Sequence, residues 1–210
     1  MSRYCLVVDL DRCIGCHACE VACKNENEVA LGQYLNTVHQ VGPHGDFPDL
    51  EQYWLPVQCQ QCENAPCQEI CPTGATYRDE NGTVQIDEDV CIGCQLCMDA
   101  CPYGVRSVNV ERNIVQKCTM CKHLTDEGGQ PACVAACCAA ARFWGDVDDP
   151  DSDVATALAA ADADALHKLP DDGNSPLTTY ILSERVASWI DLDELAPASE
   201  SVGAPWMRAE

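Results

Sequence analysis

The cysteines of this 210-residue chain are the residues whose spacing could do chemistry, because sixteen of the eighteen fall into four groups. Thiolates two or three residues apart bind zinc or iron–sulfur clusters, and C-x-x-C-H attaches a c-type haem. In every group the last two cysteines are separated by three residues, while the earlier gaps vary. In chain order the groups are Cys13, Cys16, Cys19 and Cys23; Cys59, Cys62, Cys67 and Cys71; Cys91, Cys94, Cys97 and Cys101; and Cys118, Cys121, Cys133 and Cys137.

The first group also spells a haem-attachment signature, because His17 follows Cys13 and Cys16. Haem would leave the last two cysteines of this group without a role. Gln95 stands at the equivalent position of the third group, where haem would need a histidine. The repeat therefore favours iron–sulfur clusters over haem.

Zinc is the more serious rival, because paired C-x2-C ligands also form structural zinc sites. The first and third groups, however, place four cysteines within eleven residues, which crowds a single tetrahedral ion. The second and third groups end in Cys71-Pro72 and Cys101-Pro102, as in two-cluster bacterial ferredoxins, where the fourth cysteine binds the other cluster. We therefore expect 4Fe–4S clusters, with a zinc-stabilised scaffold as an alternative.

Short strands and helical turns are expected around the cysteine groups, where secondary structure is sparse. The Asn81-Gly82 pair predicts a hairpin turn. Helical turns are expected after the third cysteine of each group, as in EVAC and MDAC. Residues 24–58 and 122–132 contain turn residues and show no clear period. Strands are predicted at residues 4–9, 83–86, 105–110 and 142–147.

The composition changes at Asp146, after which aspartate and alanine dominate. Apolar residues recur with helical spacing from Val154 to Ala165, so a surface helix is predicted there, with Ser152 or Asp153 as its N-cap. Beyond the helix we expect an extended acidic arm that packs on the core or on a partner.

The net charge of −22 argues against nucleic acid and anionic membrane surfaces as partners, because both would repel the chain. A solubilising acidic surface accounts for most of this charge. No run approaches the roughly 18 apolar residues that a membrane span needs, so no span is expected. No signal peptide precedes the first group, and the cysteines are closely clustered, so we do not expect a disulfide scaffold.

Several basic residues stand near the cysteines of this acidic chain. A 4Fe–4S cluster with four thiolates carries about two negative charges, and reduction adds one more, so a nearby cation should raise its potential. We predict such an effect for the two lysines that flank cysteines, Lys117 and Lys122. The full set is Lys24, Arg106, Lys117, Lys122 and Arg142.

The sequence resembles the four-cluster iron–sulfur subunits of the dimethyl sulfoxide reductase family of molybdenum and tungsten enzymes, over roughly residues 1–150. The resemblance rests on DLDRCIGCHACEVACK, LPVQCQQCENAPCQEICPTGA, DEDVCIGCQLCMDACPYGVR, KCTMC and PACVAACCAAARFWGDVDDPDS. It implies an α+β fold of two bacterial ferredoxin-like dicluster modules, with short strands and helices, many loops and an acidic C-terminal extension. Residues 1–150 would form the four-cluster domain, and residues 151–210 the acidic helix and extended tail.

The family's pairing joins the first cysteine group with the fourth in one module and the second with the third, at about residues 51–112, in the other. Cys138 stands where relatives usually have proline, so we expect it to be an inert neighbour of Cys137, with a role as substitute ligand as the alternative. Cys5 is expected to be a small buried apolar residue. Carried onto this sequence, the pairing assigns Cys13, Cys16, Cys19 and Cys137 to cluster one; Cys118, Cys121, Cys133 and Cys23 to cluster two; Cys59, Cys62, Cys67 and Cys101 to cluster three; and Cys91, Cys94, Cys97 and Cys71 to cluster four.

The resemblance also implies an electron-transfer subunit with no catalytic site of its own. It would carry single electrons between a molybdopterin-containing catalytic subunit, near cluster one, and a quinone-reactive membrane subunit or soluble carrier, near cluster four. A free-standing polyferredoxin shuttle is the alternative function. Relatives often cross the membrane folded, on a catalytic partner that bears a twin-arginine signal. We therefore expect a peripheral membrane complex on the extracytoplasmic face, with a cytoplasmic location as the alternative.

Overall fold

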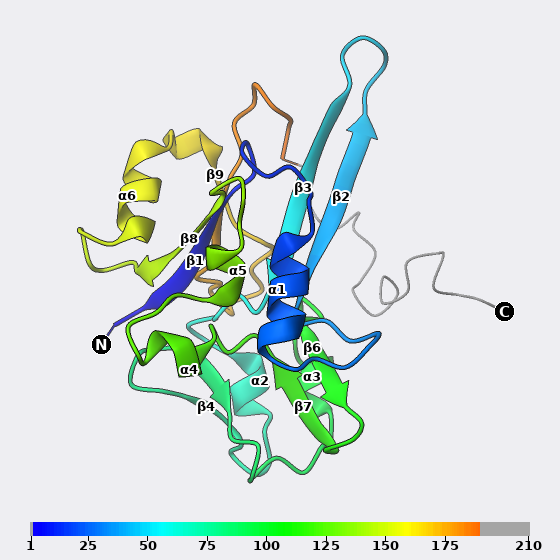
Figure 1. Cartoon of the computed structure of the whole chain (residues 1–210), viewed down its shortest axis with the longest axis vertical. Helices are drawn as coiled ribbons and strands as arrows, with labels where there is room; N and C mark the ends of the chain where they lie inside the picture. The colour runs from blue at the N-terminus through cyan, green and yellow to red at the C-terminus, as the bar shows by residue number, and fades with distance from the viewer. Residues whose placement is uncertain (1, 190–210) are drawn as a thin grey trace, which may run out of the picture.

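The computed structural model describes residues 2–189, which form four small sheets with short helices around them (Figure 1). One sheet has four strands, and the other three are two-stranded hairpins. The elements are β1 (Tyr4–Asp9), α1 (Ala18–Glu26), β2 (Asn36–His44), β3 (Glu51–Gln58), α2 (Pro66–Glu69), β4 (Thr76–Arg78), β5 (Val84–Ile86), α3 (Leu96–Asp99), β6 (Arg106–Asn109), β7 (Ile114–Lys117), α4 (Lys122–Thr125), α5 (Ala132–Ala135), β8 (Arg142–Asp146), α6 (Asp153–Ala160), η1 (Ala163–Ala165), β9 (Leu166–His167) and β10 (Thr179–Ile181).

The four-stranded sheet joins the two ends of the described chain, in the order β8-β1-β10-β9. Strand β1 pairs antiparallel with β8 and parallel with β10. The side chains in the middle of β1 are fully buried, and α6 packs against β8 and β1. The segment that follows the fourth cysteine group is therefore fixed beside the segment that precedes the first.

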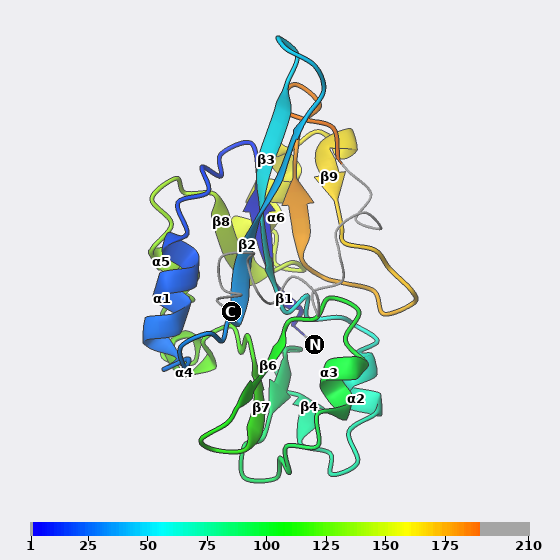
Figure 2. The ribbon, with the colours of Figure 1, turned by 90° about the vertical axis from the view of Figure 1, so that its right-hand side faces the viewer.

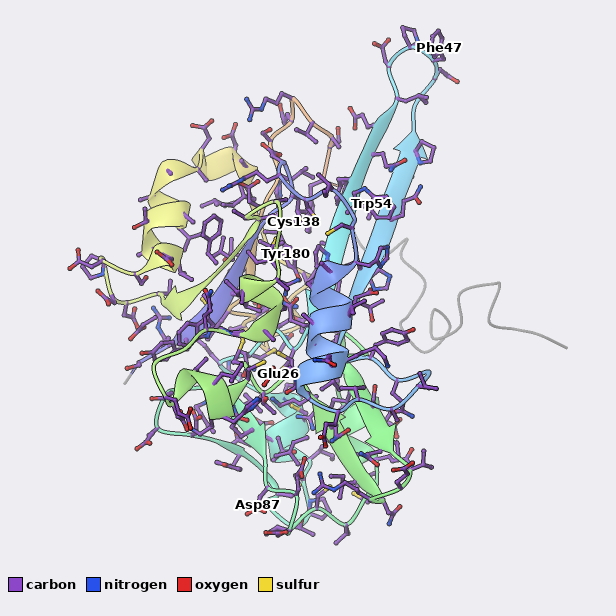
Figure 3. The ribbon with its side chains drawn as sticks, viewed as in Figure 1. Glu26, Phe47, Trp54, Asp87, Cys138 and Tyr180 are labelled. Atoms are coloured by element: carbon purple, nitrogen blue, oxygen red, sulfur yellow. The ribbon has the colours of Figure 1, made fainter. Side chains whose placement is uncertain are left out.

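The remaining strands form hairpins with different surroundings. Hairpins β4–β5 and β6–β7 lie together with α2 and α3 in the lower half of the molecule, whereas α1, α4 and α5 lie along one side of it (Figure 2). Hairpin β2–β3 projects from the upper half, and Phe47 at its tip is 88% exposed (Figure 3).

The four predicted strands are confirmed as β1, β5, β6 and β8, with ends that differ by at most one residue. The predicted turn at Asn81-Gly82 connects β4 to β5, and Gly82 has a φ of 74° that glycine adopts without strain. Helix α6 starts where its capping residue predicts, because the Ser152 hydroxyl accepts a hydrogen bond from the Ala155 N–H at 3.0 Å.

Residues 24–58, for which the sequence predicted turn residues and no clear period, contain the end of α1 and the hairpin β2–β3, which were not predicted. Buried side chains do recur in both strands, as at Val38 and Val41 in β2. The buried positions of β2 change phase within its regular pairing, from Asn36 and Val38 to Val41, and the pairing then shifts register between Val41 and His44, so no clean alternation is visible in the sequence. Residues 122–132 likewise contain the short helix α4, although their sequence shows no helical periodicity.

The segment after α6 differs from the expected extended arm, because β9 and β10 add two strands to the sheet of β1. Tyr180 of β10 is fully buried, and its hydroxyl accepts a hydrogen bond from Gln60 Nε2 at 3.1 Å. Strands of two and three residues are too short to show a pattern in the sequence. What was expected of residues 190–210 lies outside the described residues.

Candidate metal centres

Each of the four cysteine groups begins with the same loop, in which the residue before the second cysteine has a positive φ. This left-handed conformation bends the chain sharply, and the first two cysteines of each group line one cavity. Glycine adopts it freely, while the other two residues adopt it at some cost in strain. The four residues are Gly15 at 64°, Gln61 at 51°, Gly93 at 66° and Met120 at 58°.

A helix begins one residue before the third cysteine of every group, which confirms the predicted helical turns. Helices α2, α3 and α5 have four residues each, and the fourth cysteine follows their C-cap residue. The proline after Cys71 and after Cys101 prevents the helix from continuing. Helix α1 instead runs on to Glu26 and contains Cys23, which is followed by Lys24. Three groups therefore turn their last cysteine off the helix, and the first group does not.

Four small cavities are lined by these cysteines, and each takes three cysteines from one group and one from another. All sixteen predicted ligands lie in these cavities, in the same sets of four that the family pairing gives. Iron binding by these sets stays a prediction. The cavities are lined by Cys13, Cys16, Cys19 and Cys137 (cavity one); Cys118, Cys121, Cys133 and Cys23 (cavity two); Cys59, Cys62, Cys67 and Cys101 (cavity three); and Cys91, Cys94, Cys97 and Cys71 (cavity four).

The two remaining cysteines lie outside the cavities. Cys5 is buried in β1, where burial raises the pKa of its thiol to about 12. Cys138 is exposed, with its Sγ 3.8 Å from the Sγ of Cys16. His17 borders cavity one, but its Nδ1 pairs with Glu20 Oε2 at 2.9 Å, so its ring is held by a carboxylate.

Hydrogen bonds to the cysteine sulfurs come from residues that the sequence did not single out. Asn174 Nδ2 donates to Cys62 Sγ at 3.2 Å, although it lies 112 residues further along, in a loop that carries no motif. Burial alone would raise the pKa of Cys71, but donors from Thr76 and Thr73 outweigh it and bring the pKa to about 7. Such donors stabilise the thiolate that a metal requires.

The residues of the cavities fit an anionic metal–thiolate centre. Burial raises the pKa of several cavity thiols, to about 12 for Cys23 and about 11 for Cys62, and a bound metal would hold these sulfurs as thiolates. Three buried cations have no carboxylate within ion-pair distance among residues 2–189. A buried charge without a counter-ion costs several kcal/mol, and metal-bound thiolates would supply the missing negative charge. The cations are Arg106, Lys117 and Arg142.

A single metal ion fits the arrangement less well. Within residues 2–189, no group of three or more His, Cys, Asp or Glu side chains is arranged to hold one ion. The four cysteines of each cavity instead stand around a shared space, as the ligands of a polynuclear cluster do.

Two family models match the chain, a 4Fe–4S dicluster domain over residues 50–147 and a 4Fe–4S binding domain over residues 6–25. Together with the cysteine cavities, they define an iron–sulfur protein with ferredoxin-like domains that bind 4Fe–4S clusters.

Relatives narrow this class. A Halobacterium salinarum protein described as a dimethyl sulfoxide reductase iron–sulfur subunit is 40% identical, over 95% of this chain and 90% of its own. A sulfite dehydrogenase subunit of Allochromatium vinosum is 37% identical, over 100% of this chain and 94% of its own. The arsenate respiratory reductase iron–sulfur subunit of a Shewanella species is 34% identical, over 85% and 95%. The chain belongs to the iron–sulfur electron-transfer subunits of the dimethyl sulfoxide reductase family of molybdopterin oxidoreductases.

Replacing Gly15 by alanine should disrupt cavity one. The new Cβ would lie 2.1 Å from Trp54 Cδ2, in a backbone with a φ of +64°. Gly32→Ala is the matched control, because Gly32 has a φ of +77° and no atom within 4 Å of its Cβ position. In the control, backbone strain should lower the free energy of unfolding by about 1 kcal/mol and leave the iron content unchanged. Gly15→Ala should lose iron as well. Anaerobic iron analysis checks this, and equal iron contents in the two variants would contradict it.

Removing iron should unfold most of the chain, because cysteines of the cavities are part of its buried core, as Cys62, Cys67 and Cys97 show. The energy of metal binding is then also energy of folding. After anaerobic chelation, we expect the far-ultraviolet circular dichroism spectrum to lose most of its helix and strand signal. The cooperative melting transition should be lost as well. A spectrum and melting curve unchanged by chelation would refute this prediction.

Proposed function

We propose that this chain relays single electrons through four 4Fe–4S clusters between a molybdopterin-containing catalytic subunit and a second redox partner. The observation that carries the proposal is the set of four cavities, each lined by four cysteines from two groups. Cavities one to four would hold clusters one to four, with the cysteines of each cavity as ligands. A bound 4Fe–4S cluster takes up and releases one electron, and the chain fixes its position and surroundings.

Contacts between neighbouring cavities support a row in the order one, two, three, four. Arg142 lines both cavity one and cavity two. Cys118 of cavity two lies within electrostatic reach of Cys59 of cavity three. Arg106 lines cavity three and lies within electrostatic reach of Cys97 of cavity four. Electrons that enter at one end would thus have a neighbouring site at each step.

The two outer cavities reach the surface, which suits them to meet partners. Cys16 of cavity one and Cys94 of cavity four are exposed, whereas no cysteine of cavities two and three is exposed. Ile14 and Ile92, in the two matching CIGC loops, are 63% and 60% exposed. Apolar side chains around an exposed redox site favour docking of another protein surface.

The relatives support the choice of partners. Their names include iron–sulfur subunits of a dimethyl sulfoxide reductase and of an arsenate respiratory reductase, so a separate catalytic subunit would hold the substrate. We propose that cavity one faces this molybdopterin-containing subunit and that cavity four faces a quinone-reactive membrane subunit or a soluble carrier. The chain would then have no substrate chemistry of its own. No helix within residues 2–189 combines the length and the apolar character that a membrane span requires.

Purification separates this function from a free polyferredoxin shuttle and from a zinc scaffold. An anaerobic preparation should be brown, contain about four irons for each cluster and elute with a large catalytic partner. A chain that elutes alone under all conditions would favour the shuttle, and zinc in place of iron would favour the scaffold.

We also propose that the assembled complex lies on the extracytoplasmic face of the membrane, carried there by a partner with a twin-arginine signal. Clusters are assembled in the cytoplasm, so export would require a folded complex. Protease treatment of intact cells should then digest this subunit once its partners are removed or loosened, together with an external control protein. Survival of the subunit beside a digested control would favour the cytoplasmic alternative.

The ligand sets predict different defects for two cysteine variants. Cys97→Ser should damage cluster four alone, so an artificial one-electron dye that reaches the catalytic subunit should still support substrate turnover while quinone-linked turnover is lost. Cys19→Ser should damage cluster one and disconnect the catalytic subunit from the relay. Cys138→Ser is the control, since Cys138 lies outside the cavities, and it should keep both activities.

Electron paramagnetic resonance of the same three variants checks which cluster is affected. The assignment of Cys97 and Cys19 to different clusters is wrong if Cys97→Ser loses the signal that Cys19→Ser also loses, and the choice of Cys137 as ligand is wrong if Cys138→Ser loses any signal.

A further inference from the structure

Among residues 2–189, the charged residues that are buried as a whole are all basic, whereas the nearly buried carboxylate of Asp79 pairs with Lys122. The buried basic residues of this part of the chain are Arg106, Lys117 and Arg142, which are 5%, 1% and 4% exposed. The chain as a whole has a net charge of −22. None of the three forms an ion pair with a carboxylate of the described residues. Acidic residues are thus abundant on the surface and do not accompany the cations inside.

Arg142 lies between cavities one and two and lines both of them. Its guanidinium donates to Gln58 Oε1 at 2.9 Å and to Asn36 Oδ1 at 3.4 Å, and its Nε has no hydrogen-bond partner in the protein. Cys19 of cavity one and Cys133 of cavity two are both within its electrostatic reach. Neutral amides therefore orient this cation without cancelling its charge.

Arg106 has the corresponding place between cavities three and four. It lines cavity three and lies within electrostatic reach of Cys97 of cavity four. Its guanidinium contacts Thr76 Oγ1 at 3.4 Å, and one terminal nitrogen has no partner in the protein. A neutral hydroxyl again takes the place that a carboxylate would occupy in an ordinary buried ion pair.

The two arginines occupy equivalent positions in the sequence and in the fold. Arg106 follows Cys101 by five positions, and Arg142 follows Cys137 by five. Each is the first residue of the strand that leaves its cysteine group, β6 and β8 respectively. The same local geometry thus places an arginine between two neighbouring cavities at two places in the fold.

Lys117 lies at the remaining junction, between cavities two and three. Its Nζ donates to the carbonyl oxygen of Cys118, which lines cavity two, at 2.7 Å. It also donates to the carbonyl oxygen of Val84, which lines cavity three. Both acceptors are uncharged, so this cation too keeps its full charge between two sites.

We propose that each of these buried cations acts on the two clusters beside it, stabilising the reduced form of both and so raising their potentials in overlapping pairs. The inference rests on the four clusters of the proposed function. Reduction adds one electron and no proton, taken from the neighbouring site or from a chemical reductant, so the negative charge of the site increases by one. At low effective dielectric constant, a cation at the junction favours that added charge on either side.

Lys122 provides the matched control. It follows Cys121 directly, as Lys117 precedes Cys118, but it is partly exposed and its Nζ pairs with Asp126 at 2.9 Å and Asp79 at 3.4 Å. Two carboxylates and solvent offset its charge. From the sequence alone the two lysines had the same expected effect, and their surroundings in the fold separate them.

The test is an anaerobic redox titration with dithionite of the full chain with its clusters, followed by electron paramagnetic resonance. The variants are Arg142→Gln, Lys117→Gln, Arg106→Gln and, as control, Lys122→Gln. Each of the first three should lower two of the four midpoint potentials. The pairs for Arg142 and Lys117 should share one signal, those for Lys117 and Arg106 should share another, and those for Arg142 and Arg106 should share none.

The overlap can be judged without assigning any signal to a cluster. Midpoints that move singly, move all together or do not move would overturn the inference, as would a shift in the Lys122 variant. If a glutamine variant does not retain iron, Arg142→Lys, Arg106→Lys or Lys117→Arg is measured instead. Moving the charge should then give a smaller shift, confined to the same pair, and a shift in other midpoints or in none would count against the inference. Fewer than four clusters in the parent chain would contradict the proposed function instead.

Discussion

Each cavity depends on the convergence of cysteines from two separate segments of the chain. Three thiols come from a tight loop and the start of a helix, and the fourth comes from the end of another group. This exchange ties the first group to the fourth and the second to the third. Cys62, Cys67 and Cys97 of cavities three and four are also part of the largest buried cluster of side chains, whereas Cys19, Cys133 and Cys23 lie in two smaller buried clusters. We therefore expect the folding of the chain and the filling of the cavities to be coupled.

The same convergence explains the distribution of charge. Four thiolate-bound clusters would place a large negative charge inside a protein that is already acidic, and the charged residues buried as a whole among residues 2–189 are all basic. Their hydrogen-bond partners are neutral, namely the amides of Asn36 and Gln58, the hydroxyl of Thr76 and two backbone carbonyls. A carboxylate at any of these places would neutralise the cation locally. The cation would then no longer offset the negative charge of the neighbouring clusters.

The parts of the structure that could be predicted from the sequence are those in which the spacing of residues reflects local backbone geometry. Cysteine intervals predicted the four loops and helical turns, and the serine before Asp153 predicted the start of α6. The hairpin β2–β3 could not be predicted, because the buried positions of its strands do not alternate regularly. Strand β10 was missed because its pairing with β1 is long-range and only three residues long. Asn174 was missed for a related reason, since only the folded chain brings it to Cys62.

The pairing of distant segments also sets an order in which the chain can be completed during synthesis. Cavities three and four use cysteines between residues 59 and 101, so their ligands are present once the ribosome has passed the middle of the chain. Cavities one and two need Cys137 and Cys133, and β1 gains its parallel neighbour only when residues 179–181 have been translated. The first cysteines to emerge are thus among the last to obtain their full set of partners. The cysteines of the N-terminal loop must therefore remain unmodified in the reducing cytoplasm until the chain has been made as far as Cys137.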